Sequence, residues 1–250
     1  MVCRLRLGQS HGQPQNFLGP KLVTSPLSNP IPIMKTLRVL LSIAIAIAIA
    51  SETSAGFAEA LARYQATPAS KVTVNGTSTI HDWKMEGKII GGHFDIDSNF
   101  PLDTSAGKLP DLKVNSTAEV SIPVQSIKSG TKRMDEVMLE AMKQPEFPKI
   151  TYKLTELSPR TGQHKPGDPL EFVSKGELTI AGVTKPVEMS VTMEKFEGNK
   201  LKIIGSTPIK MTHHGIKPPA PNIALGLIKV GDEVKVSFEW ITAQKNEAAK

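Results

Sequence analysis

The chain has 250 residues, of which 39% are hydrophobic and only 5% aromatic, and this length and composition suit one domain with a single core. The net charge is +6, but from Leu61 onward 25 basic residues stand against 22 acidic ones. Because this small excess contains no cluster of Lys and Arg interleaved with aromatic residues, it argues against nucleic-acid binding. The single cysteine, Cys3, lies far upstream of this part of the chain, so no disulfide is expected in the domain.

Residues 34–60 have the order of a bacterial signal peptide. A basic start at Met34 to Arg38 is followed by an apolar run, Val39 to Ala50, and then by small residues. Cleavage is expected after Ala58 or Ala60, which would give a periplasmic or secreted protein. The alternative is an uncleaved anchor, but the run is shorter than the ~20 residues of a stable membrane span.

The sequence predicts one folded domain flanked by other segments. Residues 1–33 show no periodicity and are expected to be a non-native or disordered leader, because the signal peptide begins at Met34. Residues 61–70 are expected to form a linker, residues 71–242 the domain, and residues 243–250 a disordered tail.

Several segments alternate apolar and polar residues with the period of a strand that has one buried face. This pattern is typical of antiparallel sheets rather than buried parallel ones. The apolar positions are Trp83, Met85, Gly87 and Ile89; Val114, Ala118, Val120, Ile122 and Val124; Ile150, Tyr152 and Leu154; Val187, Met189, Val191 and Met193; and Val234, Val236, Phe238 and Trp240.

Two tight connections, Ala181-Gly182 and Gly198-Asn199, predict hairpins between consecutive strands. With Lys71 to Val74 added, about eight strands are expected. The fold class is therefore mainly all-β, and a closed antiparallel barrel of about eight strands has an interior that either packs solid or holds one small ligand.

One segment departs from the strand period. Met134, Val137, Met138, Ala141 and Met142 recur at helical spacing, and Pro145 follows as a stop signal. We expect one helix between Thr131 and Lys143 that covers an opening of the barrel and turns its methionines inward. A helix that only fills core space is the alternative.

Four motifs in this order resemble the YceI-like polyisoprenoid-binding family. The resemblance covers about residues 71–242. The motifs are VNGTSTIHDW at 74–83, PEFPKITY at 145–152, LTIAGVTKPV at 178–187, and KMTHHGIKPP at 210–219 followed by GDEV at 231–234.

The resemblance implies a lipocalin-like antiparallel barrel, periplasmic or secreted, with a tunnel for an isoprenoid or another long-chain lipid. It implies no shared catalytic residues and no cofactor. The chain departs from the family pattern at His213-His214, where an acidic residue followed by an aromatic one is more usual, so any hydrogen-bonding role of that position is in doubt.

The candidate tunnel residues are apolar or aromatic side chains on the expected inward faces. His81 is added as a candidate for contact with a ligand head group. The tunnel candidates are Trp83, Met85, Ile89, Val120, Ile122, Met134, Met138, Phe147, Tyr152, Leu178, Met189, Val191, Met193, Ile209, Met211, Phe238 and Trp240.

No catalytic or metal site is predicted. His81 and Asp82 are adjacent on a strand, so their side chains face opposite sides and a catalytic relay between them is geometrically poor. A structural role for His81 is the alternative to head-group contact. His213 and His214 lack the one or two further ligands that a tetrahedral metal site needs.

The sequence is compatible with two functions. The first is an exported protein that sequesters or carries a long-chain apolar ligand, which could be a polyisoprenoid, a quinone-like lipid or a fatty-acid derivative. The second is an envelope stress or interaction protein whose barrel core is solid and holds no lipid. The expected partners are a lipid and no nucleic acid; no stable membrane span is expected, and a homodimer is compatible with either function.

Overall fold

The computed structural model describes residues 60–102, 113–160, 168–220 and 228–245. The expected leader at 1–33 and nearly all of the expected signal peptide at 34–60 lie outside the described residues, as does most of the expected tail.

The described residues form eleven β-strand segments, one α-helix and two short 3-10 helices. All strand pairings are antiparallel and belong to one sheet. The elements are β1 Leu61–Ala66, β2 Lys71–Ser78, β3 Trp83–Gly87, β4 Gly91–Asp97, β5 Ser116–Pro123, η2 Val124–Ser126, β6 Ile127–Lys128, α2 Lys132–Ala141, β7 Lys149–Pro159, β8 Leu170–Ile180, β9 Val183–Phe196, β10 Lys200–Lys210, η3 Met211–His214 and β11 Val230–Gln244.

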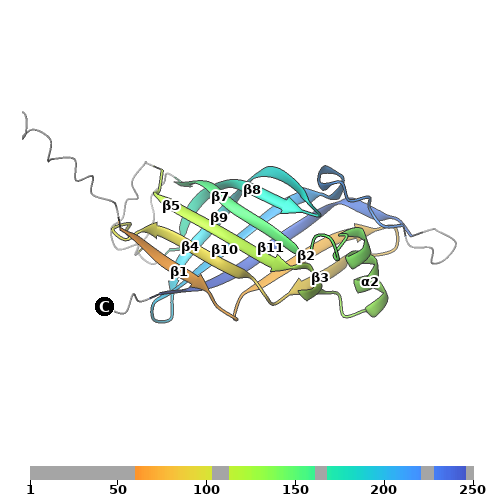
Figure 1. Cartoon of the computed structure of the whole chain (residues 1–250), viewed down its shortest axis with the longest axis horizontal. Coiled ribbons are helices and arrows are strands. Elements are labelled where there is room, and N and C mark those ends of the chain that lie inside the picture. Colours follow the sequence, from red (N-terminus) through yellow and green to blue (C-terminus); the bar gives the residue numbers. More distant parts are fainter. Residues whose placement is uncertain (1–59, 103–112, 161–167, 221–227, 246–250) are drawn as a thin grey trace, which may run out of the picture. The chain divides into compact units, whose positions relative to one another are not determined.

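The sheet closes into a barrel of eight strands, because six of the segments are halves of interrupted strands. β1 and β2 both pair with β11. β4 pairs with β1, and β3 pairs with β2. In the same way, β5 pairs with β4, and β6 pairs with β3. The remaining neighbours are consecutive from β7 to β11 (Figure 1). The predicted antiparallel barrel of about eight strands is therefore confirmed.

The first strand corrects the prediction of a linker at 61–70. β1 pairs with β4 and, from Tyr64 to Ala66, with β11. Its inward side chains are Ala62, Tyr64 and Ala66, which alternate as a strand requires but bring too little apolar surface to stand out in the sequence. Only the turn before Lys71 links β1 to β2. The strand β11 likewise runs to Gln244, so the expected tail at 243–250 begins too early.

Both predicted hairpin turns are present. Ala181 and Gly182, between β8 and β9, have positive φ angles of 48° and 78°, and Gly198, between β9 and β10, has a φ of 64°. Two consecutive residues with positive φ are typical of the hairpin turn whose twist matches that of the flanking strands.

The predicted helix is also confirmed. α2 follows the two-residue strand β6 and lies at one end of the barrel, beside the ends of β2 and β3 (Figure 1). Its N-terminus is held to the preceding loop by Asp135, whose carboxylate accepts hydrogen bonds from the backbone N–H and the hydroxyl of Ser129, each 2.7 Å long.

Candidate ligand-binding cavity

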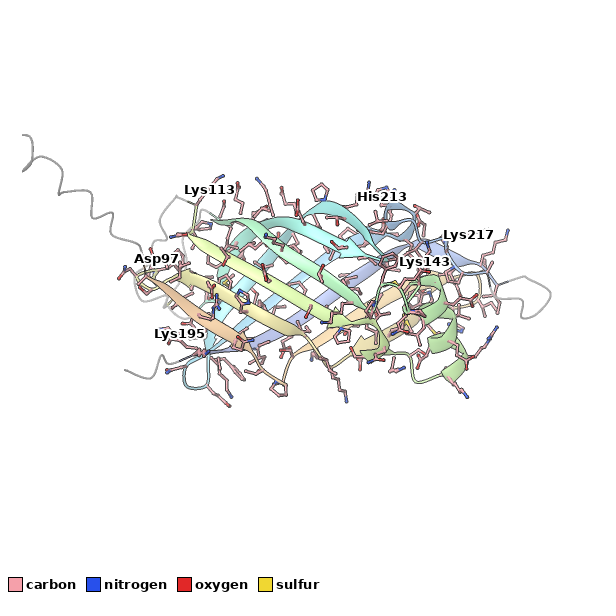
Figure 2. The ribbon with its side chains drawn as sticks, in the orientation of Figure 1. Asp97, Lys113, Lys143, Lys195, His213 and Lys217 are labelled. Atoms are coloured by element: carbon pink, nitrogen blue, oxygen red, sulfur yellow. The ribbon has the colours of Figure 1, made fainter. Side chains whose placement is uncertain are left out.

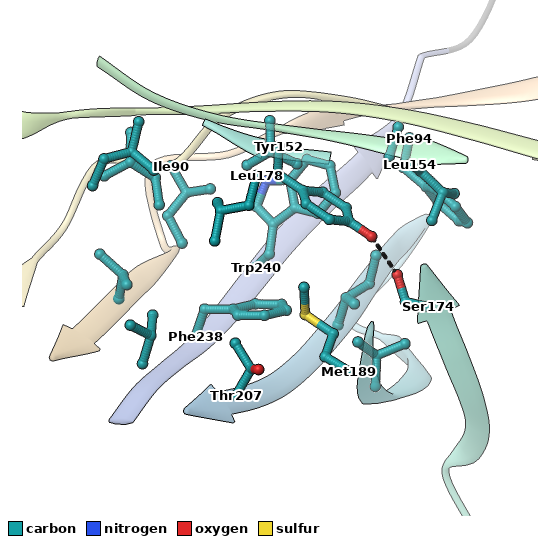
Figure 3. A pocket seen from close by; sticks show the side chains of 18 of the residues that line it. Ile90, Phe94, Tyr152, Leu154, Ser174, Leu178, Met189, Thr207, Phe238 and Trp240 are labelled. Atoms are coloured by element: carbon teal, nitrogen blue, oxygen red, sulfur yellow. Dashed lines mark hydrogen bonds between the residues drawn. The ribbon is translucent and has the colours of Figure 1, made fainter. Parts of the chain in front are cut away.

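The inward side chains of the barrel do not fill its interior. A cavity of about 150 Å³ remains in the part of the barrel enclosed by Phe94, Leu157, Val191 and Trp240, and we call it the inner cavity (Figure 3). Most of its lining residues are aliphatic or aromatic, because one face of every strand is apolar. The interior is thus hollow, which argues against the solid core of the alternative function.

A second cavity of about 370 Å³ lies beneath α2, and we call it the outer cavity. The helix contributes Met134, Val137 and Met138 to its wall, and η3 contributes Met211 and His214. Methionine side chains are flexible and polarisable, so this wall can adapt to ligands of different shape. The volume falls within the range of about 300–1,000 Å³ that is common for small-molecule sites.

The two cavities meet at a ring of β-branched residues, which we call the belt. Each belt residue lines both cavities, and the six come from six different strand segments around the barrel wall. The cavities therefore adjoin along the interior, and their apolar linings are continuous. The belt consists of Val74, Ile127, Ile150, Ile180, Ile209 and Val236.

Glycines lie opposite aromatic residues on neighbouring strands of the barrel. Gly205 pairs with Phe238 across β10 and β11, and a Cβ at Gly205 would lie 2.5 Å from the Phe238 ring. A Cβ at Gly176 would likewise lie 2.5 Å from the Tyr152 hydroxyl oxygen. The missing Cβ atoms let both aromatic rings lie close to the barrel wall.

The inner cavity contains a small set of uncharged polar groups. The Tyr152 and Ser174 hydroxyls form a hydrogen bond 2.7 Å long (Figure 3). Burial raises the pKa of Tyr152, although the hydrogen bond with Ser174 acts in the opposite direction. Tyr152 is therefore neutral at physiological pH. The indole Nε1 of Trp240 is buried and has no hydrogen-bond partner among the described residues.

Among the described residues, the basic side chains that line the cavities belong to the outer cavity. Arg133 and His81 line it, and the Arg133 guanidinium lies 3.4 Å from a carboxylate oxygen of Glu136. His81 Nδ1 lies 2.8 Å from the backbone oxygen of Asp82. This contact is to the backbone rather than to the carboxylate, so it gives His81 no acidic partner for a catalytic relay.

The side chains of His213 and His214 lie in different environments. His214 is buried, with 4% of its surface exposed, and its Nδ1 lies 3.1 Å from the backbone oxygen of Val183, which ties η3 to β9. His213 is exposed on the outside of the protein (Figure 2). Among the described residues, no group of three or more His, Cys, Asp or Glu side chains could hold a metal ion.

Most of the sequence candidates line the two cavities. Ile209, in the belt, lines both. The inner cavity has Val120, Ile122, Tyr152, Leu178, Met189, Val191, Met193, Phe238 and Trp240, and the outer cavity has His81, Trp83, Met85, Met134, Met138 and Met211.

Two candidates line neither cavity. Ile89 is 55% exposed, whereas Ile90 is 4% exposed and lines the inner cavity. The alternation of β3 ends at Gly87, and the break before β4 changes which residues face inward. Phe147 lines neither cavity. Its ring packs against Gly182 in the turn between β8 and β9, so closely that a Cβ at that glycine would clash with the ring.

Several other lining residues were not predicted from the sequence. Phe94 alternates with Ile96 on β4, and this signal was available in the sequence. Leu157 faces inward only because a bulge between Leu154 and Glu156 shifts the register of β7. Ser174 and Thr207 are polar residues at inward positions, so a search for apolar alternation could not find them.

In the part of the chain that the structure describes, no helix has the length and apolar character needed to cross a membrane.

Comparison with known proteins identifies this architecture. A family model described as the YceI-like domain matches residues 63–241. BcnA from Burkholderia cenocepacia has 20% sequence identity and a TM-score of 0.54, with 70% of this chain and 98% of that chain covered. No match was found among curated proteins.

A second solved structure is a polyisoprenoid binding domain from Saccharophagus degradans implicated in plant cell wall breakdown. It has 13% identity and a TM-score of 0.52, with 74% of this chain and 100% of that chain covered. At such low identities, the similarity to the two structures shows a shared fold.

Proposed function

Since the chain belongs to the YceI-like domain family, we propose that it is an exported lipid-binding protein that sequesters or carries a long-chain apolar ligand inside its barrel. The observation that carries this proposal is the pair of adjoining apolar cavities that meet at the belt. The solved polyisoprenoid binding domain with the same fold supports an isoprenoid chain as the cargo. The role is binding, without chemical change of the ligand.

The energetics favour an apolar chain. Removing apolar groups from water contributes about 0.8 kcal/mol per methylene, and the cavity walls are built mainly from Val, Ile, Leu, Met and aromatic side chains. An isoprenoid tail would therefore bind mainly through the apolar surface that it buries, which grows with its length. Quinone-like and fatty-acid-derived lipids satisfy the same requirement with their tails.

Export is the second part of the proposal. It rests on the basic, apolar and small-residue segments of 34–60. The backbone oxygen of Ala60 accepts a hydrogen bond from the Ser98 N–H at 2.9 Å. Cleavage after Ala58 keeps this bond and cleavage after Ala60 removes the carbonyl, so we favour Ala58. N-terminal sequencing of the protein from the producing cell tests this, and a mature chain beginning at Met1 would contradict it.

A matched pair of variants on β10 tests lipid binding. Ile209 belongs to the belt, whereas Ile204 is 40% exposed on the outer face of the same strand. Ile209→Phe should obstruct the path between the cavities and reduce uptake of squalene, and Ile204→Phe should not. Uptake is measured by incubating purified protein with squalene in detergent, separating the protein by gel filtration and quantifying the bound lipid. No squalene on the wild type, or equal uptake by both variants, would contradict the proposal.

A further inference from the structure

The polar groups of the inner cavity form a distinct local environment inside an apolar barrel. Apart from methionine sulfur, the hydrogen-bonding side-chain atoms that the described residues bring to its lining come from Tyr152, Ser174, Thr207 and Trp240. None of these groups carries a charge at neutral pH. Among the described residues, the basic side chains that line the cavities, His81, Arg133 and His214, belong to the outer cavity.

One hydroxyl hydrogen of the Tyr152 and Ser174 pair is not used by the hydrogen bond between them. Tyr152 and Ser174 together carry two O–H hydrogens, and their mutual bond uses one of them. Ser174 is buried, so its hydroxyl is shielded from bulk water. A buried donor without an acceptor costs free energy, and a ligand oxygen placed beside the pair would accept the second hydrogen.

Trp240 adds a second donor of the same kind. Its Nε1–H is buried without a partner, although the indole ring lines the inner cavity. Thr207 contributes little, because its hydroxyl is directed at the backbone oxygen of Pro208 over 3.4 Å. The inner cavity thus has two buried donor hydrogens without an acceptor, one from the hydroxyl pair and one from Trp240, and suits a group that accepts hydrogen bonds without carrying a charge.

We propose that the inner cavity is the head-group site, and that it takes a neutral lipid head with hydrogen-bond-accepting oxygens, such as the ring carbonyls of a quinone. The lipid lies head first in the barrel, and its tail passes the belt toward the methionines beneath α2. This inference rests on the proposed function and adds to it the class of the head group and the orientation of the ligand.

A competition experiment tests the inference. Purified protein is incubated in detergent with equal amounts of menaquinone-4, an isoprenoid quinone, and squalene, an isoprenoid hydrocarbon without a head. The protein is separated by gel filtration, and the ratio of the two bound lipids is measured by mass spectrometry. The test variant is the double substitution Tyr152→Phe with Ser174→Ala, which removes both hydroxyls and leaves no orphaned partner.

The matched control is Thr179→Val with Thr184→Val. These two residues also form a hydroxyl pair, 2.8 Å apart, but they are exposed and line neither cavity. The inner double variant should lower the quinone-to-squalene ratio about threefold to tenfold, as expected for one lost hydrogen bond. Squalene binding alone and the ratio for the control variant should stay at the wild-type values.

Three results would overturn the inference. If the wild type binds both lipids but the inner double variant leaves their ratio unchanged, the head does not lie in the inner cavity. If Arg133→Gln lowers the ratio and the inner variant does not, the head lies at the outer cavity and the orientation is reversed. If the wild type binds neither lipid, the proposed function fails, and the head-group site fails with it.

Discussion

Met193 and Thr192 are neighbours on β9, and their side chains lie on opposite faces of the barrel wall. Met193 is 3% exposed and lines the inner cavity, whereas Thr192 is partly exposed and pairs with Ile204 on the outer face. The alternation of β9 thus separates a residue that would contact the ligand from one that contacts water, and this difference can be tested with the same substitution at both positions.

Met193→Glu should reduce the amount of lipid bound to the protein or lower its stability by about 1–3 kcal/mol, because an unpaired polar group would be buried. Thr192→Glu should change stability by no more than about 0.5 kcal/mol. Urea denaturation and quantification of bound lipid measure both effects, and an unchanged circular dichroism spectrum shows that a variant is folded. Equal effects of the two substitutions would mean that the inward face of β9 is assigned wrongly.

Asp95 is a charged residue held on the outer side of the wall between β1 and β5. Arg63 donates two hydrogen bonds to its carboxylate, at 2.8 and 2.7 Å. These bonds lower the pKa of Asp95, although partial burial raises it, and the positive charge of Arg63 also lowers it. The pair links β1 to β4, so it helps to close the barrel at the strand that the sequence analysis missed.

The lowered pKa predicts how stability depends on pH. A carboxylate with a folded pKa below its unfolded value of about 3.9 stabilises the fold above that pH, and the stabilisation is lost as pH falls through the folded pKa. Asp95→Asn should therefore reduce stability at pH 7 by about 1 kcal/mol or more, and the difference from wild type should shrink below about pH 4. Urea denaturation across this range measures it, and a difference that grows toward acid would contradict the account.

At the scale of the strands, long uninterrupted elements could be predicted and interrupted ones could not. β9 from Val187 to Met193 and β11 from Val234 to Trp240 keep strict alternation, and their inward residues were identified correctly. The misplacement of Ile89 and the omission of Leu157 have a common cause, since a break or a bulge shifts the alternation by one residue. Such irregularities depend on the pairing with neighbouring strands, which a single sequence does not display.

The candidate site was predicted in its apolar part only. The alternation of apolar and polar residues in the sequence identifies residues such as Val191 and Phe238, because apolar side chains occupy the buried face of a strand. Ser174 breaks that period, and its role depends on the approach of Tyr152 from the neighbouring strand. The partner of a polar inward residue is set by strand register, so it became visible only in the structure.

The contact between Gly205 and Phe238 leads to a prediction at the same scale. Gly205→Ala should lower stability by about 1–3 kcal/mol, because its Cβ would lie 2.5 Å from the Phe238 ring and 3.0 Å from Val191. Adding Phe238→Leu should recover part of this loss, since the smaller side chain relieves the clash. Urea denaturation of the two single variants and the double variant gives the coupling energy. Additive effects would show that the two residues do not interact as described.

At the scale of the whole molecule, the eight-stranded barrel encloses two adjoining apolar cavities. The barrel wall is closed by pairing β1 with β11, and α2 and η3 line the wider cavity. A closed sheet leaves no edge between β1 and β11, so the interior is separated from solvent along that seam. Among the described residues, the inner cavity is lined by uncharged side chains, so the barrel encloses an apolar space that is separated from water.

The central claim is that the barrel interior holds a lipid, and the most direct test is to extract the protein purified from its producing cell with organic solvent and analyse the extract by mass spectrometry. The account predicts a long-chain lipid in an amount comparable to the protein, with an isoprenoid tail and a neutral oxygen-containing head. The same extract from Met193→Glu should contain markedly less of it. A wild-type extract without lipid, from protein that also takes up no squalene or menaquinone-4, would contradict the account.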